Sequence, residues 1–117
     1  MTIEELQTIC NQLSGVTQDI KWEDHLSFNI GGKMFLVTSP DSVPISASFK
    51  VLEEEYEEVL SKEGFYFNVY LGRYKWVSLD DINRLSGKQW EYYIRKSYEL
   101  IASKLPVKVK KQIGLIK

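Results

Sequence analysis

Residues 72 to 79, GRYKWVSL, place two cations beside two aromatic side chains. Arg73 and Lys75 are two positions apart, and Tyr74 and Trp76 alternate with them. Side chains two apart on a β-strand lie on one face, so the cations would share one face and the aromatics the other. Exposed cations can contact phosphate groups, but any half-buried strand produces the same alternation. We expect both cations to be accessible to solvent and both aromatic side chains to lie in the core.

The second half of the chain holds most of the other cations. Residues 1 to 63 contain 12 acids and 4 Lys or Arg residues, whereas residues 64 to 117 contain 4 acids and 11 Lys or Arg residues. A basic surface attracts phosphate polymers and an acidic one repels them, so any nucleic-acid contact is expected from the second half. The alternative is that the two halves fold together and their charges partly pair.

We predict phosphate contacts at cations that avoid the apolar positions of the predicted elements. Such contacts position a nucleic acid without reading its bases, and no segment is identifiable as a recognition helix. The expected binding is weak, sensitive to salt and nearly indifferent to base sequence. The predicted contacts are Arg73, Lys75, Lys88, Arg95, Lys96, Lys108, Lys110 and Lys111.

Residue types needed for catalysis are scarce. A nucleophile needs a base, and His25 is the single histidine. Asp24 precedes it, but neighbouring strand residues point to opposite faces, so we expect no catalytic pair. The sequence has no G-x-x-x-x-G-K-[ST] phosphate loop, and its glycines are too widely spaced for a dinucleotide turn. We therefore predict a protein that is not an enzyme and has no cofactor.

Metal and redox chemistry also lack their usual residues. Cys10 is the only cysteine, so it cannot form an internal disulfide or complete a metal-binding pair. It falls on the apolar stripe of a predicted helix, which indicates a small buried hydrophobe. The acids of residues 53 to 58 lie along a predicted solvent-facing arc without a histidine, so we predict no metal site.

Size and composition indicate one soluble globular domain over residues 1 to 117, with 44% hydrophobic and 26% charged residues. No apolar run approaches the roughly 18 residues that a membrane span needs, so no membrane contact is expected. The opening MTIEELQTIC carries acids where a signal peptide would be basic and then apolar. We expect a cytoplasmic protein.

Several segments show the helical spacing of apolar residues, and two of them follow a capping box, Thr2 with Glu5 and Ser86 with Gln89. The predicted helices are an opening helix ending near Ser14 and Gly15, an acidic helix over Leu52 to Glu63 with Gly64 as its C-cap, a long helix after Ser86 that stops at Pro106, and a basic final segment over Val107 to Ile113.

Between the opening helix and the acidic helix, the apolar period changes to two. His25 to Ile30 and Lys33 to Thr38 alternate on either side of Gly31 and Gly32, which supply the positive φ angles of a hairpin turn. This order of elements predicts an α+β fold, an antiparallel β-sheet flanked by an N-terminal helix and C-terminal helices. Further strands are predicted at Ile45 to Lys50 and Tyr74 to Leu79, with a weaker strand around Asp19 to Trp22 and an extended segment from Phe65 to Tyr70.

Four stretches together resemble the MmcQ/YjbR family. They are MTIEELQTICNQLSG at the start, WEDHLSFNIGGKMFLV in the predicted hairpin, ASFKV before the acidic helix, and KWVSL with SYELIASKLPVKVK near the end. The resemblance covers essentially the whole chain as a pattern of positions without a catalytic fingerprint. It implies a small bacterial α+β protein with a fold like that of frataxin homologues or type III secretion chaperones. It also implies DNA as the partner, bound through a double-wing arrangement.

The sequence departs from this family at one position. Many relatives have a histidine before the tryptophan of the late strand, where this chain has Lys75 before Trp76. An activity that needs that histidine is therefore not expected at this position.

DNA binding is the leading interpretation, and two others stay open. The acidic helix and the basic tail could pair with a protein partner or a second copy by charge complementarity. Phe28 and Phe35 near the hairpin would then offer an apolar contact, unless both fill the core. A frataxin-like fold also suggests iron or another metal at the acidic helix, although a fold does not transfer a site.

Overall fold

The computed structural model describes residues 1–22 and 24–116. Its strands form one antiparallel sheet in the order β1-β2-β3-β4-β6-β5. The strands are β1 (Val16–Lys21), β2 (His25–Ile30), β3 (Lys33–Ser39), β4 (Ser46–Lys50), β5 (Phe65–Phe67) and β6 (Trp76–Leu79). The α+β class and the hairpin between β2 and β3 are as predicted.

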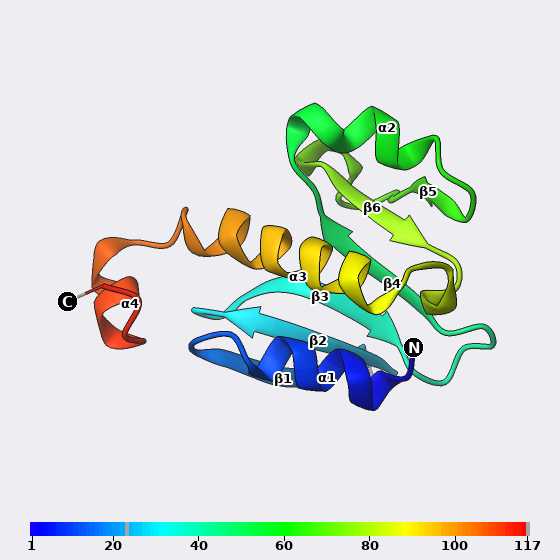
Figure 1. Cartoon of the computed structure of the whole chain (residues 1–117). Coiled ribbons are helices and arrows are strands. Elements are labelled where there is room, and N and C mark those ends of the chain that lie inside the picture. Colours follow the sequence, from blue (N-terminus) through cyan, green and yellow to red (C-terminus); the bar gives the residue numbers. More distant parts are fainter. Residues whose placement is uncertain (23, 117) are drawn as a thin grey trace.

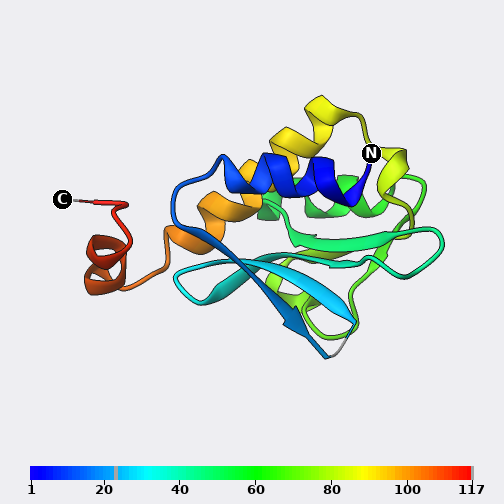
Figure 2. The ribbon, with the colours of Figure 1, turned by 90° about the horizontal axis from the view of Figure 1, so that it is seen from below.

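Helices cover one face of this sheet and leave the other face open (Figures 1 and 2). The covering layer consists mainly of α1 (Ile3–Asn11) and α3 (Gly87–Ala102), which contact each other. The short helix α4 (Val107–Gln112) lies beyond the C-terminal end of α3 (Figure 1). The remaining helical segments are η1 (Glu53–Glu55), α2 (Tyr56–Leu60), η2 (Gly72–Tyr74) and η3 (Ile82–Arg84).

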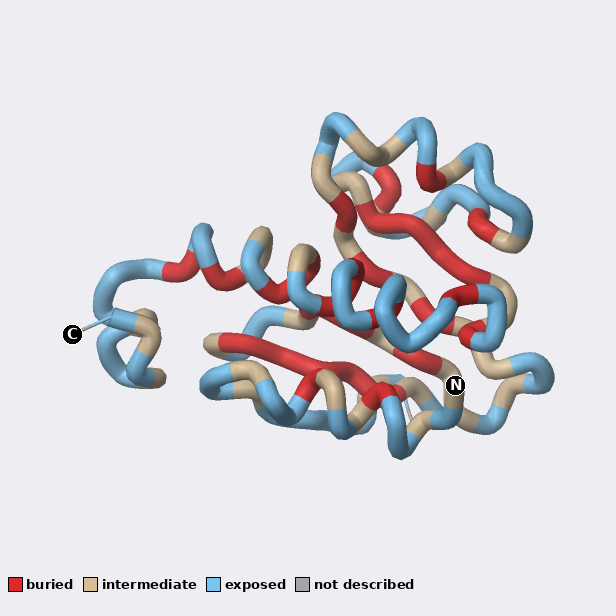
Figure 3. Tube along the Cα trace, in the orientation of Figure 1, coloured by how far each residue is buried: buried red, intermediate tan, exposed pale blue. Residues whose placement is uncertain are grey.

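The core lies between the sheet and the helix layer, where the buried positions of Figure 3 face one another. Phe49 of β4 packs edge-on against Trp90 of α3, with ring centroids 5.5 Å apart, and lies 5.3 Å from the ring of Tyr93. Phe35 of β3 packs edge-on against Tyr98 at 5.5 Å. Such edge-to-face pairs add to the free energy gained by burying the rings.

Both predicted capping boxes are present. The Thr2 hydroxyl accepts from the Glu5 backbone N–H at 3.1 Å, and the Glu5 carboxylate accepts from the Thr2 N–H at 3.2 Å. Ser86 and Gln89 repeat this arrangement at the start of α3, at 3.2 and 2.9 Å. Each box satisfies two backbone donors that would otherwise lack partners at the helix start. The N-terminal boundaries of α1 and α3 are therefore local properties of the sequence.

Cys10 and the two hairpin phenylalanines lie in the core. Cys10, Phe28 and Phe35 are all 0% exposed. Burial raises the pKa of the Cys10 thiol to about 12, so the predicted role as a small buried hydrophobe is confirmed. The interpretation that Phe28 and Phe35 offer an apolar contact to a partner is wrong, because both fill the core.

Ser97 of α3 bonds to the backbone of both β3 and β4 where the pairing between these two strands ends. Pairing between β3 and β4 stops at Leu36 and Phe49, and Ser97 lies beyond that point with 0% exposure. Its hydroxyl donates to the Phe35 carbonyl at 2.5 Å and accepts from the Lys50 backbone N–H at 3.1 Å. Ser97 thus satisfies two backbone groups that strand pairing leaves open, and it fixes the end of β4.

The chain before β6 differs from the prediction of a strand over Tyr74 to Leu79. The Asn68 side-chain carbonyl accepts from the backbone N–H groups of Tyr70 and Leu71, at 3.0 and 2.8 Å. Such side-chain bonds to the backbone compete with strand pairing, and here the chain coils into η2. Lys75 then adopts φ +67°, and the strand begins only at Trp76.

Two expectations for this segment were therefore wrong. Tyr74 is 50% exposed rather than in the core, whereas Trp76 is 5% exposed as expected. Arg73 and Lys75 do not share the face of a strand, because neither lies on one. Arg73 is nevertheless exposed and Lys75 is partly exposed.

The acidic helix is shorter than the predicted Leu52 to Glu63 and is divided between η1 and α2. Glu53 and Glu54 each have another glutamate four positions later, and like charges at that spacing destabilise a helix. The prediction that Gly64 is the C-cap of this helix was wrong, because α2 ends at Leu60 with Ser61 as its C-cap; Gly64, with φ +87°, lies in the turn before β5. Across residues 1–22 and 24–116, no helix is long and apolar enough to cross a membrane.

Candidate functional site

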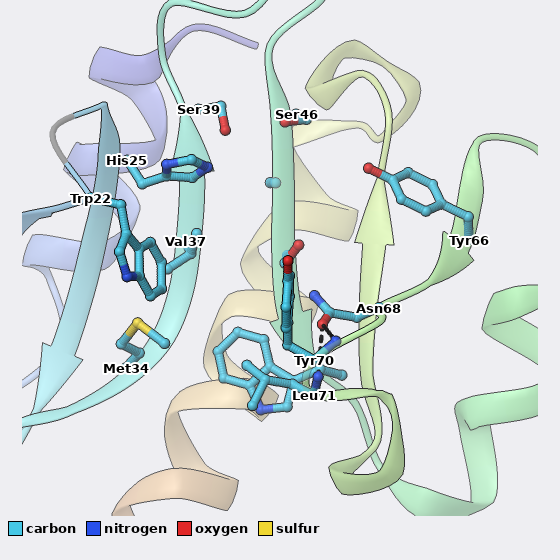
Figure 4. A pocket seen from close by; sticks show the side chains of 13 residues that line it. Trp22, His25, Met34, Val37, Ser39, Ser46, Tyr66, Asn68, Tyr70 and Leu71 are labelled. Carbon is cyan, nitrogen blue, oxygen red and sulfur yellow. Dashed lines mark hydrogen bonds between the residues drawn. The ribbon is translucent and has the colours of Figure 1, made fainter.

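The open face of the sheet holds a cleft of about 820 Å³ (Figure 4). One wall carries Trp22 and His25, at the turn between β1 and β2 and the start of β2. The opposite wall carries Tyr66, Asn68 and Tyr70, from β5 and the segment that follows it. The volume lies within the range of about 300–1,000 Å³ that is typical of ligand sites.

Three serines, Ser39, Ser46 and Ser48, add hydroxyls to a cleft lining that is mainly apolar. Along β4, Ala47 and Phe49 are buried, while Ser46 and Ser48 alternate with them and line the cleft. The hydroxyls of Ser48 and Ser78, on neighbouring strands, are 2.9 Å apart. A hydroxyl can both donate and accept a hydrogen bond, so this part of the lining can adapt to different polar groups.

The walls present aromatic rings to solvent. Trp22 is 67% exposed and Tyr70 is 88% exposed, so both rings have surface available for contact. Trp76, which also lines the cleft, is largely covered. Among the described residues that line the cleft, none is Asp or Glu. The cleft lining is therefore mainly aromatic and apolar, with a few polar groups, and the Asp24 carboxylate lies beside it, 2.7 Å from His25 Nδ1.

The backbone on both sides of the cleft adopts an unfavourable conformation. Trp22 has φ +51° and Lys75, directly before Trp76, has φ +67°. In the described part of the chain, these two are the non-glycine residues with positive φ. Holding a non-glycine residue in this backbone conformation costs of order 1–3 kcal/mol. Such residues concentrate at functional sites, where the surrounding structure holds them in place. Their positions support the cleft as the site.

His25 contacts Asp24, although strand alternation predicted that the two side chains would point to opposite faces. Its Nδ1 lies 2.7 Å from Oδ1 of Asp24, because Asp24 belongs to the turn before β2 and the strand alternation does not apply to it. The His25 ring also meets Trp22 edge-on, at 5.6 Å between centroids. Within the described structure His25 makes no hydrogen bond to a serine or cysteine that it could activate. Its contacts hold one wall of the cleft in place.

Four cations, Lys50, Arg73, Lys75 and Lys104, lie beside the cleft without lining it, and we call them the cleft-end cations. Arg73 and Lys75 lie in the chain between Leu71 and Trp76, which line the cleft, and Lys104 lies near Lys50. Lys50 is the cross-strand partner of Trp76, and its ammonium group donates to the Tyr74 carbonyl. Burial is the largest cause that lowers the pKa of Lys50; the nearby charges of Lys104 and Lys75 lower it further, and the nearby Glu53 carboxylate opposes them. Lys50 therefore lies near two other cations, Lys104 and Lys75, and near one carboxylate, that of Glu53.

Aromatic rings support two of these cations. The Arg73 guanidinium lies 4.9 Å from the centre of the Tyr74 ring, and the Lys75 ammonium lies 4.7 Å from that of Tyr56. Such contacts stabilise a cation without neutralising it. Among the residues that the structure describes, none of the four cleft-end cations forms an ion pair. They remain available to an anionic ligand.

The other six predicted contacts lie elsewhere. Lys88, Arg95 and Lys96 belong to α3 in the helix layer, where Lys96 pairs with Glu99 at 3.7 Å. The remaining three belong to α4, beyond the end of α3 (Figure 1). Of the predicted set, Arg73 and Lys75 lie beside the cleft, in the chain between its lining residues Leu71 and Trp76, and neither lines it. The six helical contacts stay a prediction. The three on α4 are Lys108, Lys110 and Lys111.

Sequence reasoning missed Lys50 and every aromatic wall of the cleft. One signal was present, because Ser46 and Ser48 alternate with apolar residues and so place hydroxyls on one face of a strand. A second was the number of aromatics in residues 65 to 74, more than the core could take. No local pattern shows that Lys50 lies beside Trp76, because strand order decides it.

Metal binding has no support in the described residues, since no group of three His, Cys, Asp or Glu side chains could hold an ion. The architecture is that of a small α+β domain, with one layer of helices on one face of the sheet and a cleft on the open face.

The chain belongs to the YjbR family, whose model matches residues 11–100. No curated protein matches the chain.

Two solved structures are similar to this fold. A Deinococcus radiodurans protein, DR2400, with the domain DUF419, is 22% identical with a TM-score of 0.84, over 97% of this chain and 88% of that one. A Pseudomonas syringae protein is 17% identical with a TM-score of 0.69, over 86% of this chain and 98% of that one. Identities this low show the shared fold and carry no statement about function.

Proposed function

We propose that this protein binds nucleic acid through phosphate contacts at the cleft-end cations and catalyses no reaction on it. The observation that carries the proposal is the gathering of cations without ion pairs beside a cleft that no described carboxylate lines. Cations that neutralise phosphates release the counterions condensed on the polymer, which favours binding. The overall charge of −1 makes this local grouping the main source of attraction.

Carboxylates around α3 make the outer face of the helix layer a less favourable place for phosphate binding than the cleft end. The Tyr92 hydroxyl donates to the Glu55 carboxylate at 2.8 Å, which places the acidic η1 segment beside α3. The Lys96 ammonium lies 5.8 Å from the Tyr92 ring and already pairs with Glu99. A phosphate that approached Lys96 would meet the carboxylates of Glu55 and Glu99. At the cleft end the Glu53 carboxylate lies near Lys50, but among the described residues none of the four cleft-end cations forms an ion pair.

Fluorescence anisotropy of a short labelled oligonucleotide, titrated at several salt concentrations, tests the proposal. Four phosphate contacts on a single strand give a slope of about −3 in log affinity against log salt. Affinity should therefore fall roughly 50-fold between about 50 and 200 mM salt. Absence of binding at the lowest salt concentration would refute the proposed function.

Charge reversal at two positions tests the location. The double variant Arg73→Glu with Lys75→Glu should lose most of the affinity and about half of the salt slope. The matched control, Lys33→Glu with Lys62→Glu, makes the same change in net charge away from the cleft and should keep most of the affinity. Equal losses in both variants would mean that net charge alone matters, and the assignment to the cleft end would be wrong.

A further inference from the structure

We infer that the cleft receives unpaired bases, so that the ligand is single-stranded nucleic acid lying across the open face of the sheet. This inference rests on the proposed function and specifies its ligand. It assigns the phosphates to the cleft-end cations and the bases to the aromatic lining and its serine hydroxyls. The duplex becomes the weaker ligand, because its bases are already stacked and paired.

The first support is the exposure of the aromatic walls. Tyr70 is 88% exposed and Trp22 is 67% exposed on opposite sides of the cleft, and half of Tyr66 is also exposed. Aromatic rings are usually covered, as they are on the other face of this sheet. Proteins that bind single strands place such rings against successive bases, and every base has a face that can stack.

The second support is that this wall is held in position. The Asn68 side chain donates to the hydroxyl of Ser78, a buried residue of β6, at 3.2 Å, and its carbonyl accepts from the backbone N–H groups of Tyr70 and Leu71. The opposite wall is held by the contact between Trp22 and His25. Walls fixed before binding lose less conformational entropy when a ligand enters.

The third support is the relation between lining and charge. Lys50 follows Ser48 by two positions on β4 and therefore lies on the face of the strand that lines the cleft. Its partner Trp76 lines the cleft. The aromatic and hydroxyl groups of the lining thus adjoin a positively charged side chain. A nucleotide has the complementary arrangement, because its flat base is attached to an anionic phosphate.

The lining also explains why little base preference is expected. Hydroxyls of Ser39, Ser46 and Ser48 can donate or accept, so they suit the edges of any base. Stacking is likewise tolerant of sequence. The structure therefore indicates recognition of the single-stranded state rather than of a particular sequence.

Three labelled probes of equal length separate the bases from the phosphates. They are a single strand of mixed sequence, its duplex, and an abasic strand that keeps the phosphates but lacks the bases. The intact protein should bind the single strand most tightly. Each stacked base is worth about 1–3 kcal/mol, so the abasic strand should bind about 5- to 150-fold more weakly per base lost.

Two variants locate the base contacts. Trp22→Ala and Tyr70→Ala should each weaken binding of the single strand by about 5- to 150-fold and leave binding of the abasic strand unchanged. The control Tyr92→Ala removes a partly exposed aromatic from the helix layer and should change neither. Tyr70 is so exposed that its replacement should not affect folding, which keeps the test decisive.

The outcomes distinguish the inference from the function on which it rests. Equal binding of all three probes, with no effect of Trp22→Ala or Tyr70→Ala, would overturn the inference while phosphate binding stands. Binding of none of the probes at low salt would overturn both. Preference for the single strand that disappears in the two cleft variants would support the inference.

Discussion

The two faces of one sheet differ in what their side chains do. On the covered face of β4, Phe49 is fully buried against Trp90 and Tyr93 of α3. On the open face of the same strand, Ser48 lines the cleft, and its hydroxyl lies 2.9 Å from that of Ser78 on β6. Alternation along the strand separates the two sets. Stability should therefore depend on one face and binding on the other.

The aromatic residues show the same contrast. Rings on the covered face pack against each other, as Phe35 does against Tyr98. Trp22 and Tyr70 on the open face leave most of their surface to solvent. Covering these rings would add to the stability of the folded domain, because burial of apolar surface is favourable. Their exposure is consistent with a surface used for contact.

The largest expected effect is on the covered face. Phe49→Ala removes a ring that contacts two aromatic residues and should lower the free energy of unfolding by about 3–5 kcal/mol. Urea unfolding followed by circular dichroism measures the change. A loss below about 1 kcal/mol would show that this face does not supply the core.

A smaller loss is expected at the junction of α3 with the sheet. Ser97→Ala leaves the Phe35 carbonyl and the Lys50 N–H without their buried partner, and should cost about 1–3 kcal/mol. Ser48→Ala is the matched control, because Ser48 is only partly buried and lies on the open face. The same unfolding experiment should show a clearly smaller loss for the control. Equal losses would contradict the contrast between the faces.

The pH dependence of stability reports the burial of Cys10. Burial raises the pKa of the folded thiol to about 12, whereas its ordinary value is 9.0, so the thiol of the unfolded chain loses its proton first. The folded state is favoured less as pH rises above about 9, and this contribution approaches 1.4 kcal/mol per pH unit. Unfolding experiments on either side of pH 9 should show a steeper fall for the natural protein than for Cys10→Ala. Identical slopes would indicate that the thiol is accessible in the folded protein.

The smallest expected change in stability is on the open face. Tyr70→Ala should alter the free energy of unfolding by less than about 0.5 kcal/mol, because the ring is 88% exposed. The variant that weakens binding of a single strand would thus leave the fold intact. A loss comparable to that of Phe49→Ala would mean that the open face also holds the fold together.

Local features of the fold could be predicted from the sequence, and contacts distant along the chain could not. The capping boxes at Thr2 and Ser86 and the Gly31–Gly32 turn depend on neighbouring residues, and all are present. The start of β6 was misplaced, because a side chain several residues earlier, Asn68, ties the backbone into a turn. Helical spacing in the acidic segment was correct, but repulsion among its glutamates was not taken into account.

The site was predicted only in part, for a related reason. Arg73 and Lys75 were selected for their charge, and they lie between the cleft-lining residues Leu71 and Trp76 without lining the cleft themselves. Their role as phosphate contacts stays a prediction. Lys50 is 26 positions from its strand partner Trp76, so only the order of strands brings the two together. The cleft likewise combines walls from the two ends of the sheet. No pattern within a single segment indicates such a surface.

The most direct test uses the three tryptophans as reporters, in a ¹H–¹⁵N spectrum recorded during titration with a single strand. Trp22 and Trp76 line the cleft, whereas the indole N–H of Trp90 donates to the Ile82 carbonyl at 2.8 Å inside the core. The account predicts that the indole signals of Trp22 and Trp76 shift and that of Trp90 does not. Stationary signals from both cleft tryptophans, with shifts confined to α3 and α4, would contradict it.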